Sequence, residues 1–107
     1  MTRESRKAVR FPVKARIVYK WVDEAGTEHV QEGRTLNISE RGALVSSLEG
    51  PPEGANVQLT LFLPPASANL PGVTVLMDGR VVRIEKGEHL NHPGRFAVES
   101  HATRLEE

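Results

Sequence analysis

Regular alternation of apolar and polar residues is the feature that most constrains how this chain can fold. Between Pro12 and Val22 the odd positions are apolar, whereas the even positions include three basic residues. The apolar residues at the odd positions are Val13, Ala15, Ile17, Tyr19 and Trp21. Because successive side chains of a strand point to opposite faces, this pattern predicts a strand with one buried and one solvated face.

Further segments of strand character follow, separated by turns and loops that Gly and Pro mark. We expect a turn at residues 23–27 and strands at residues 29–38, 42–46, 57–63, 73–85 and 95–100. The alternation within 73–85 changes phase near Asp78–Gly79, which predicts a bulge or a sharp bend. Helical periodicity is weak throughout, and residues 102–107 are long enough for at most one or two helical turns. The pattern therefore predicts an all-β fold, a small antiparallel barrel or sandwich of six strands.

Composition and charge narrow the class of ligand. The 107 residues are 38% hydrophobic and 26% charged and include no cysteine, which excludes disulfides and thiolate chemistry. No apolar run approaches the roughly 20 residues that span a bilayer. Net charge is zero, yet seven of the fourteen basic residues fall within residues 1–20. A locally basic arm on a neutral chain suits a small polyanion better than a long duplex.

Two arginines four positions apart, Arg6 and Arg10, form the first candidate binding motif. An arginine stays charged and carries a planar fork of donors, so it can bind a phosphate, read the O6 and N7 edge of a guanine or stack on the base. The same pattern also occurs by chance as a pair of solvent-exposed arginines. Alone it is weak evidence for a site.

The second motif runs from Asn37 to Gly42 at the end of a predicted strand. If the backbone is extended there, Asn37 and Ser39 point to one face and Ile38 points into the core. The Asn37 carbonyl and the Ser39 hydroxyl suit the N1–H and amine edge of a guanine. Gly42 is free to take a positive φ and leaves room for a ligand. The alternative is an ordinary Asx or Ser turn at the end of a strand.

In this order, Arg6-Lys7-Ala8-Val9-Arg10 and Asn37-Ile38-Ser39-Glu40-Arg41-Gly42 resemble the two signature motifs of the PilZ domain, a bacterial cytoplasmic receptor for cyclic di-GMP. The resemblance covers roughly residues 5–100. It implies a six-stranded antiparallel β-barrel that binds cyclic di-GMP as a monomer or a stacked dimer and signals to a downstream protein partner. The ligand-binding residues that it implies are Arg6, Arg10, Asn37, Ser39 and Gly42, with Lys7, Arg41 and Arg83 as additional candidates.

The resemblance also sets the expected domain limits and shows one departure. We expect an N-terminal arm at residues 1–5, the barrel at 6–101 and a C-terminal tail at 102–107. The family's second motif more often begins with Asp, whose carboxylate accepts two hydrogen bonds from a guanine edge. Asn37 offers a single acceptor oxygen, so a lower affinity is expected. If the chain is complete, its output passes to a separate partner protein.

Two other functions fit the same fold. One is an interaction module that no longer binds the nucleotide, and the other is a barrel that binds single-stranded nucleic acid through its basic first strand. No acid, base or nucleophile constellation predicts an enzyme. His89 and His92 have zinc-ligand spacing, but no cysteine or carboxylate cluster completes a set of four, so we expect no metal.

Overall fold

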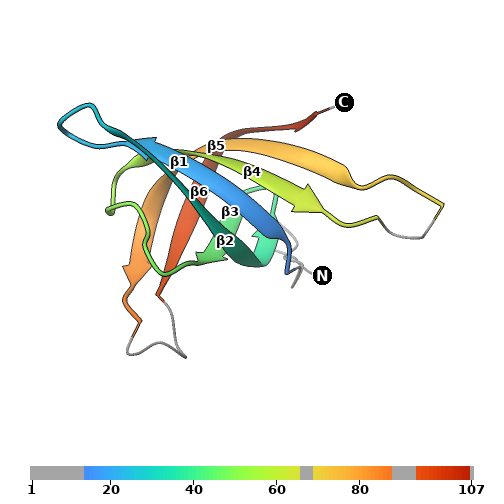
Figure 1. Cartoon of the computed structure of the whole chain (residues 1–107), viewed down its shortest axis with the longest axis horizontal. Helices are drawn as coiled ribbons and strands as arrows, with labels where there is room; N and C mark the ends of the chain where they lie inside the picture. Colours follow the sequence, from blue (N-terminus) through green and yellow to red (C-terminus); the bar gives the residue numbers. More distant parts are fainter. Residues whose placement is uncertain (1–13, 66–68, 88–93, 107) are drawn as a thin grey trace, which may run out of the picture.

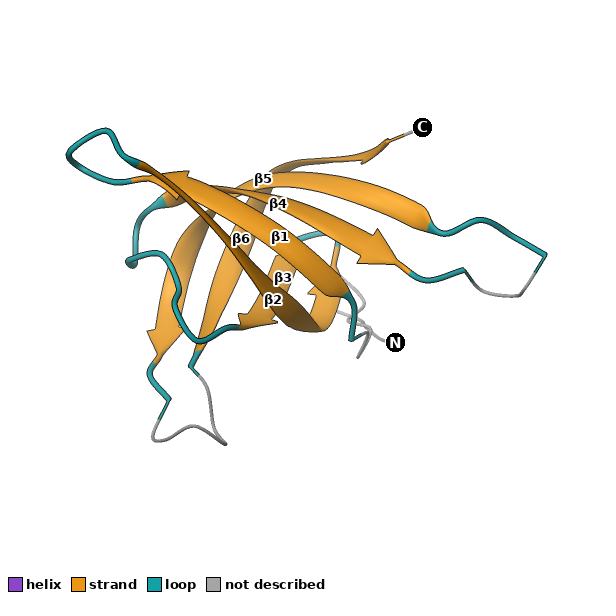
Figure 2. Cartoon of the chain, viewed as in Figure 1, coloured by secondary structure: helices purple, strands orange, loops and turns teal. Residues whose placement is uncertain are grey.

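The structure is a computed structural model that describes residues 14–65, 69–87 and 94–106. All regular secondary structure in these residues is strand (Figure 2). The six strands are β1 Arg16–Val22, β2 Glu28–Ser39, β3 Gly42–Ser46, β4 Asn56–Leu63, β5 Val73–Glu85 and β6 Arg95–Glu106. The six-stranded β fold that the sequence predicts is therefore confirmed. No helix among the described residues is long or apolar enough to cross a membrane.

The strands close into an antiparallel barrel in the order β1-β2-β3-β6-β5-β4, with β4 returning to β1 (Figure 1). Tyr19 in the middle of β1 lies opposite Gln31 of β2 on one side and Leu59 of β4 on the other. Closure gives each strand a neighbour on both sides, although β2 changes partner from β1 to β3 at Arg34 and β3 covers β6 only from Arg95 to Glu99. Of the two folds that the alternating pattern allows, barrel and sandwich, the chain therefore adopts the barrel.

The core fills the inside of the barrel with residues from every strand. Tyr19 and Trp21, which the sequence places in the core or at its rim, are both buried, and their rings stack at a centroid distance of 5.9 Å. Phe96 of β6 meets Tyr19 edge-on at 5.0 Å. The other fully buried large apolar side chains are Ile17, Val45, Leu59, Leu61, Met77 and Val81. The apolar positions of the alternating pattern are therefore the positions that pack.

One polar group of the barrel interior, the hydroxyl of Tyr19, has partners in a loop. The hydroxyl of Tyr19 bonds to the hydroxyl of Ser47 and to the carbonyl of Glu49, which ties the β3–β4 loop to the barrel end. Burial raises the pKa of the Tyr19 phenol above its ordinary value.

The predicted turn at 23–27 is present, because Asp23 Oδ1 accepts hydrogen bonds from the amides of Ala25 and Thr27 at 2.9 Å.

Thr35 fixes the point at which the chain enters the barrel. Its side chain is fully buried, and its Oγ1 accepts a hydrogen bond from the amide of Ala15 at 2.9 Å. The Thr35 amide donates to the carbonyl of Ala15, also at 2.9 Å. These contacts hold the residue before β1 against β2, two positions before Asn37. The N-terminal segment therefore leaves the barrel beside the second motif.

The β5–β6 ribbon contains two irregularities. One lies at Asp78/Gly79, where the sequence predicts a bulge; the extra residue there is His101 on β6. The second lies between Val81 and Arg83, with Val82 as the extra residue on β5. The change of phase along β5 therefore arises at Val82, three residues later than the pattern suggested. An irregularity is present at Asp78–Gly79, as predicted, but its extra residue is on β6, so it does not cause the change of phase that led to the prediction.

The C-terminal segment differs from its expected form. Residues 102–106, for which the sequence allowed at most a short helical turn, continue β6 as strand. Ala102 lies opposite Asp78 and Glu106 lies opposite Thr74. The reason is that β5 is 13 residues long and extends beyond β3, so its first residues offer a backbone partner to the end of the chain. A six-residue helix would have left those groups of β5 unpaired.

We predict that Thr35→Val destabilises the protein by about 1–3 kcal/mol, because the buried amide of Ala15 loses its acceptor while the shape of the side chain is kept. Thr60→Val, at a half-buried position on β4, is the matched control and should change stability by less than about 0.5 kcal/mol. Urea unfolding followed by the fluorescence of the single tryptophan, Trp21, measures both. Equal stability of the two variants would contradict the role of Thr35.

Candidate functional site

The second motif lies where β2 ends and β3 begins. Asn37 and Ser39 are half-buried residues of β2, and Arg41 is exposed in the turn that joins β2 to Gly42. Ile38, between them, lies opposite Ala43 and packs against the core. Asn37 and Ser39 therefore point to the outer surface of the barrel. This is the orientation that a ligand-binding role needs.

A bulge in β2 sets this orientation. Thr35 lies opposite Val45 and Asn37 lies opposite Leu44, so Leu36 is an extra residue in β2. In a regular strand Thr35, Asn37 and Ser39 would share a face, and Thr35 points inward. The extra residue shifts the alternation of inward and outward side chains by one position, so Asn37 and Ser39 point outward. The sequence analysis did not predict this bulge.

The turn of the hairpin carries a side-chain hydrogen bond of its own. Ser39 Oγ accepts from the amide of Arg41 at 3.1 Å, as in an ordinary Ser turn. The carbonyl of Arg41 accepts from the amide of Ser100 on β6 at 2.7 Å. The turn is thus held on both sides, and the Ser39 hydroxyl keeps its proton available as a donor.

Strand register aligns the motif with residues on three neighbouring strands. Asn37 lies opposite Leu44, Leu44 opposite Ala97, and Ala97 opposite Arg83. Directly opposed residues share a face, so these four side chains form one outward row across β2, β3, β6 and β5. With strands about 4.8 Å apart, the backbones of Asn37 and Arg83 are about 14 Å from each other.

A second outward row lies beside the first. It runs from Ser39 through Gly42 and Glu99 to Arg80. Arg80 and Arg83 are both exposed, and between the polar ends lie Gly42, Leu44 and Ala97 together with the exposed carboxylate of Glu99, which is directly opposite Arg80. We call this surface the motif face; its residues are Asn37, Ser39, Gly42, Leu44, Arg80, Arg83, Ala97 and Glu99.

The motif face includes two arginines of β5, outside the second motif. One is a site residue that the sequence predicts, and the other was not predicted. Arg83, an additional candidate from the sequence, shares the row of Asn37. Arg80 was not singled out, although its spacing from Arg83 across a bulge places both on this face. The available signal was the sequence Gly79-Arg80-Val81-Val82-Arg83, in which two arginines stand three apart within one strand.

Glu85 forms ion pairs with Arg83 of the motif face and with the neighbouring Arg95. Arg83 Nε lies 3.3 Å from Glu85 Oε2, and the guanidinium of Arg95 bonds to the other oxygen of the same carboxylate. All three side chains are at least 39% exposed, so each ion pair is weak in water. Glu85 therefore competes, modestly, with any anion that approaches Arg83.

Gly42 has a structural reason to be glycine. A Cβ built at this position would lie 1.8 Å from the carbonyl oxygen of Val98 on β6. The atom it would meet is backbone, so a side chain cannot be accommodated by a change of rotamer. Gly42, which as a glycine is free to take a positive φ, has a φ of 158°. The close approach of β3 to β6 is the constraint that the sequence did not reveal.

The first motif, with Arg6, Lys7 and Arg10, lies outside the described residues. The chain enters the described part beside Thr35, and Arg10 is five residues before Ala15.

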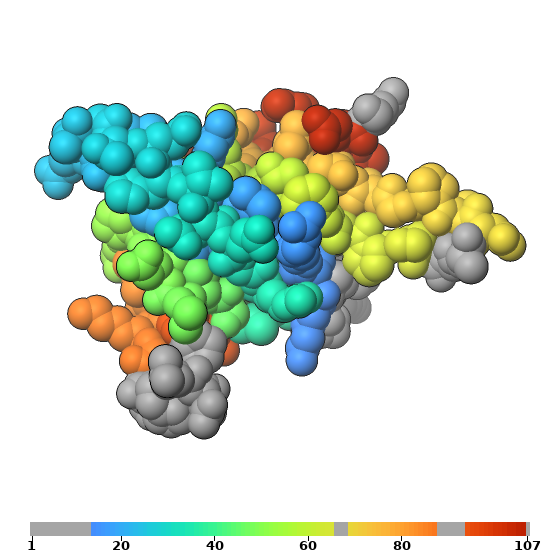
Figure 3. Space-filling model, viewed as in Figure 1, coloured from blue at the N-terminus to red at the C-terminus, as the bar shows by residue number. Residues whose placement is uncertain are grey.

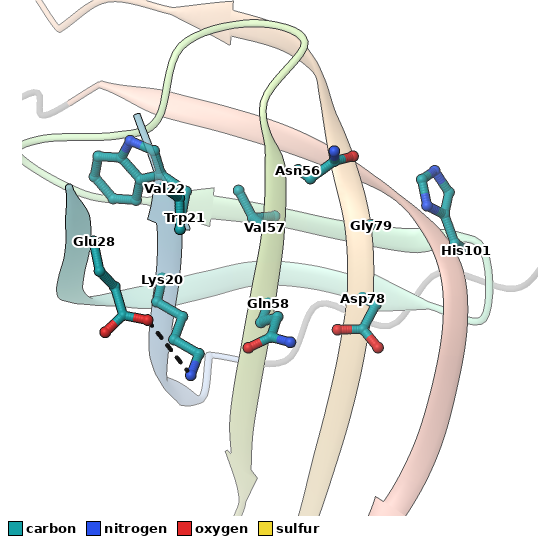
Figure 4. Close-up of a pocket in the computed structure, with 10 residues that line it drawn as sticks. All are labelled: Lys20, Trp21, Val22, Glu28, Asn56, Val57, Gln58, Asp78, Gly79 and His101. Carbon is teal, nitrogen blue, oxygen red and sulfur yellow. Dashed lines mark ion pairs between the residues drawn. The ribbon is translucent and has the colours of Figure 1, made fainter. Parts of the chain in front are cut away.

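A hollow with a volume of about 780 Å³ lies away from the motif face and is lined by residues of β1, β2, β4, β5 and β6. Figure 4 shows Lys20, Gln58 and Asp78 on three adjacent strands of its floor. Lys20 Nζ lies 3.9 Å from Glu28 Oε2, and Asp78 adds a further carboxylate. This mixture of charges does not favour a polyanion. The hollow shares no residue with the motif face, which we regard as the better candidate.

Metal ligands do not gather in the described part of the chain. Among residues 14–65, 69–87 and 94–106, no group of three or more His, Asp or Glu is arranged to hold a metal ion. His29 Nε2 donates a hydrogen bond to Asp23 Oδ2 at 2.8 Å, and its ring stacks on Trp21. His89 and His92 lie outside the described residues.

The closed barrel, the bulged strand and the outward polar rows define a small β-barrel module with one candidate ligand face. The PilZ domain family model matches residues 4–106, so the chain belongs to the PilZ domain family. The fold is similar to that in a solved structure of the Bacillus subtilis inhibitor of motility, MotI/DgrA, with a TM-score of 0.71 and 17% sequence identity. The match covers 94% of this chain and 44% of that one. No curated protein sequence matches the chain.

We predict that Gly42→Ala destabilises the barrel by about 1–3 kcal/mol or more, because the methyl group is forced against the backbone of β6. Gly26→Ala is the control: Gly26 has a φ of 85° but open space around its Cβ position, so its cost of about 1 kcal/mol is conformational alone. Urea unfolding of both variants compares them. A Gly42→Ala protein as stable as Gly26→Ala would contradict the close contact.

Proposed function

We propose that this chain is a receptor for cyclic di-GMP that binds the nucleotide on the motif face and transmits binding to a partner protein. The observation that carries the proposal is the register that brings Asn37 and Ser39 onto one outer face with Arg80 and Arg83. This arrangement supplies guanine-edge partners at one side and cationic groups at the other. It suits a ligand with two guanines and two phosphodiester charges.

The roles divide by chemistry. Asn37 and Ser39 offer an acceptor and a hydroxyl to the edge of a guanine. Arg80 and Arg83 supply charge-assisted hydrogen bonds to phosphate, and the apolar side chain of Leu44 provides a flat surface between them. Arg6 and Arg10, with Lys7 beside them and Arg41 in the hairpin turn, contact the bases and phosphates from the other side. Binding needs no chemical step, which agrees with a family of binding and adaptor modules.

The segment before Ala15, which carries Arg6 and Arg10, is the element we expect the ligand to order; in this subsection we call it the arm. Ala15 is pinned to Thr35, so the arm begins beside the motif face whatever conformation it takes. A ligand that contacts both the arm and Asn37 favours the conformations in which they are close. The surface created in this way is the one offered to a partner.

Isothermal titration calorimetry with cyclic di-GMP, with GTP as the control ligand, tests the proposal. We expect saturable binding of cyclic di-GMP and none of GTP, and the stoichiometry separates one bound ligand from a stacked pair. Replacing Arg6 or Arg10 with Ala should weaken binding about ten- to a hundredfold, the cost of a charge-assisted hydrogen bond.

Lys20→Ala is the matched control for the arginine variants, because Lys20 is basic and exposed but lines the hollow that lies away from the motif face. It should leave affinity unchanged. No heat with the wild-type protein at high micromolar ligand would refute nucleotide binding. The alternative, a PilZ module that binds a protein without the nucleotide, would then be preferred, and Asn37 in place of the usual aspartate would be its first explanation.

Glu85→Gln should tighten the binding of cyclic di-GMP by up to about fivefold, because it releases Arg83 from a weak exposed ion pair and removes a negative charge beside the anion. Glu28→Gln is the control, since Glu28 pairs with Lys20 away from the motif face. Calorimetry of both variants at low and high salt measures the effect, which should shrink as salt rises. Weaker binding by Glu85→Gln would exclude Arg83 as a phosphate contact.

A further inference from the structure

The last residues of β6 form an open sheet edge. β3 covers β6 only from Arg95 to Glu99, and the hairpin turn adds one hydrogen bond at Ser100. From His101 to Glu106, the strand pairings of the described residues involve β5 alone. Figure 1 shows this part of β6 running along β5 to the C-terminus, at the rim of the barrel. Within residues 14–65, 69–87 and 94–106, no strand pairs with the other side of these six residues.

The open edge is exposed and combines charged and apolar side chains. All residues from His101 to Glu106 are exposed, and the side chain of Leu105 is 66% accessible. In the space-filling view the end of β6 forms part of the outer rim of the molecule (Figure 3). An edge of this kind presents unpaired amide and carbonyl groups and is a template for another strand.

Leu105 extends an apolar area at the same end of the barrel. It lies opposite Val75, whose side chain is buried on the inner side of β5. Val73, two residues earlier in β5, shares that side and is 40% exposed. An additional strand at the edge would cover part of this area and remove it from water.

The charges of the edge are complementary to themselves. In an antiparallel pair related by a two-fold axis, residues at equal distances on either side of the axis oppose each other. An axis at Leu105 places Arg104 of each chain opposite Glu106 of the other, with the two Leu105 side chains in contact. An axis at Arg104 would oppose two guanidinium groups, which is unfavourable.

We propose that the open edge of β6 binds the same edge of a second copy of this chain, antiparallel and with the axis at Leu105. The edge is short, six residues from His101 to Glu106, whereas stable interfaces bury about 1,200 Å² or more. The dimer is therefore weak and depends on protein concentration. This proposal does not require that the motif face bind a nucleotide.

Disulfide trapping tests the contact at the axis. The chain has no cysteine, so Leu105→Cys introduces the only thiol. Under mild oxidation we expect this variant to form a covalent dimer. Leu48→Cys is the control, because Leu48 is 78% exposed and lies in the β3–β4 loop, away from the edge. Cross-linking of Leu105→Cys no faster than that of Leu48→Cys would overturn the proposal.

Charge reversal tests the register without a covalent bond. Sedimentation equilibrium over a series of concentrations should show wild-type dimers and at least about tenfold weaker association for Arg104→Glu, which opposes two carboxylates. The double variant Arg104→Glu with Glu106→Arg should restore association, because each chain then offers the opposite charges in the same places. Lys86→Glu, at an exposed position next to β5, controls for net charge. A wild-type protein that stays monomeric, or a double variant no better than Arg104→Glu, would refute this pairing.

Discussion

The structure depends on the passage of β6 between two glycines. Gly42 on β3 and Gly79 on β5 flank the residues Val98 and Glu99, and a Cβ at Gly79 would lie 2.4 Å from the Glu99 carbonyl oxygen. Because neither strand carries a side chain at this point, both approach the backbone of β6 closely. This close packing draws β3 and β5 together around β6, and with them the two ends of the motif face.

The motif residues therefore separate into two physical classes. Gly42 is required by the packing of strands, whereas Asn37 and Ser39 point outward and satisfy nothing in the core. Ser39 binds the amide of Arg41 but keeps its proton, and Asn37 is aimed outward by the Leu36 bulge. A strand that bends to send two polar groups outward accepts a local cost in pairing, and such bulges are frequent beside binding sites. The function that we propose for the face would rest on its side chains, while its shape rests on the glycines.

Local pattern predicted most of the strands but not the contacts between them. The alternation from Ala15 to Trp21 identified the core residues of β1, because burial on one face leaves a period of two in the sequence. The Leu36 bulge left no such mark, since a single extra residue between polar neighbours does not disturb an apolar period. Arg80 was missed for a related reason. Its place in the same row as Ser39 follows from the pairing of four strands, which no short segment encodes.

β6 connects the motif face to the open edge. The Arg41 carbonyl bonds to Ser100, and the next residue, His101, is the extra residue after which β6 has β5 as its partner among the described strands. The hairpin that carries Asn37 and Ser39 thus ends where the open edge begins. If a ligand at the motif face and a second copy at the edge both bind, any effect of the first on the affinity of the second must be matched by an equal effect in return. The magnitude of that coupling is set by how far β6 moves as a rigid strand, and its close contact with Gly42 and Gly79 restricts independent movement of its two halves.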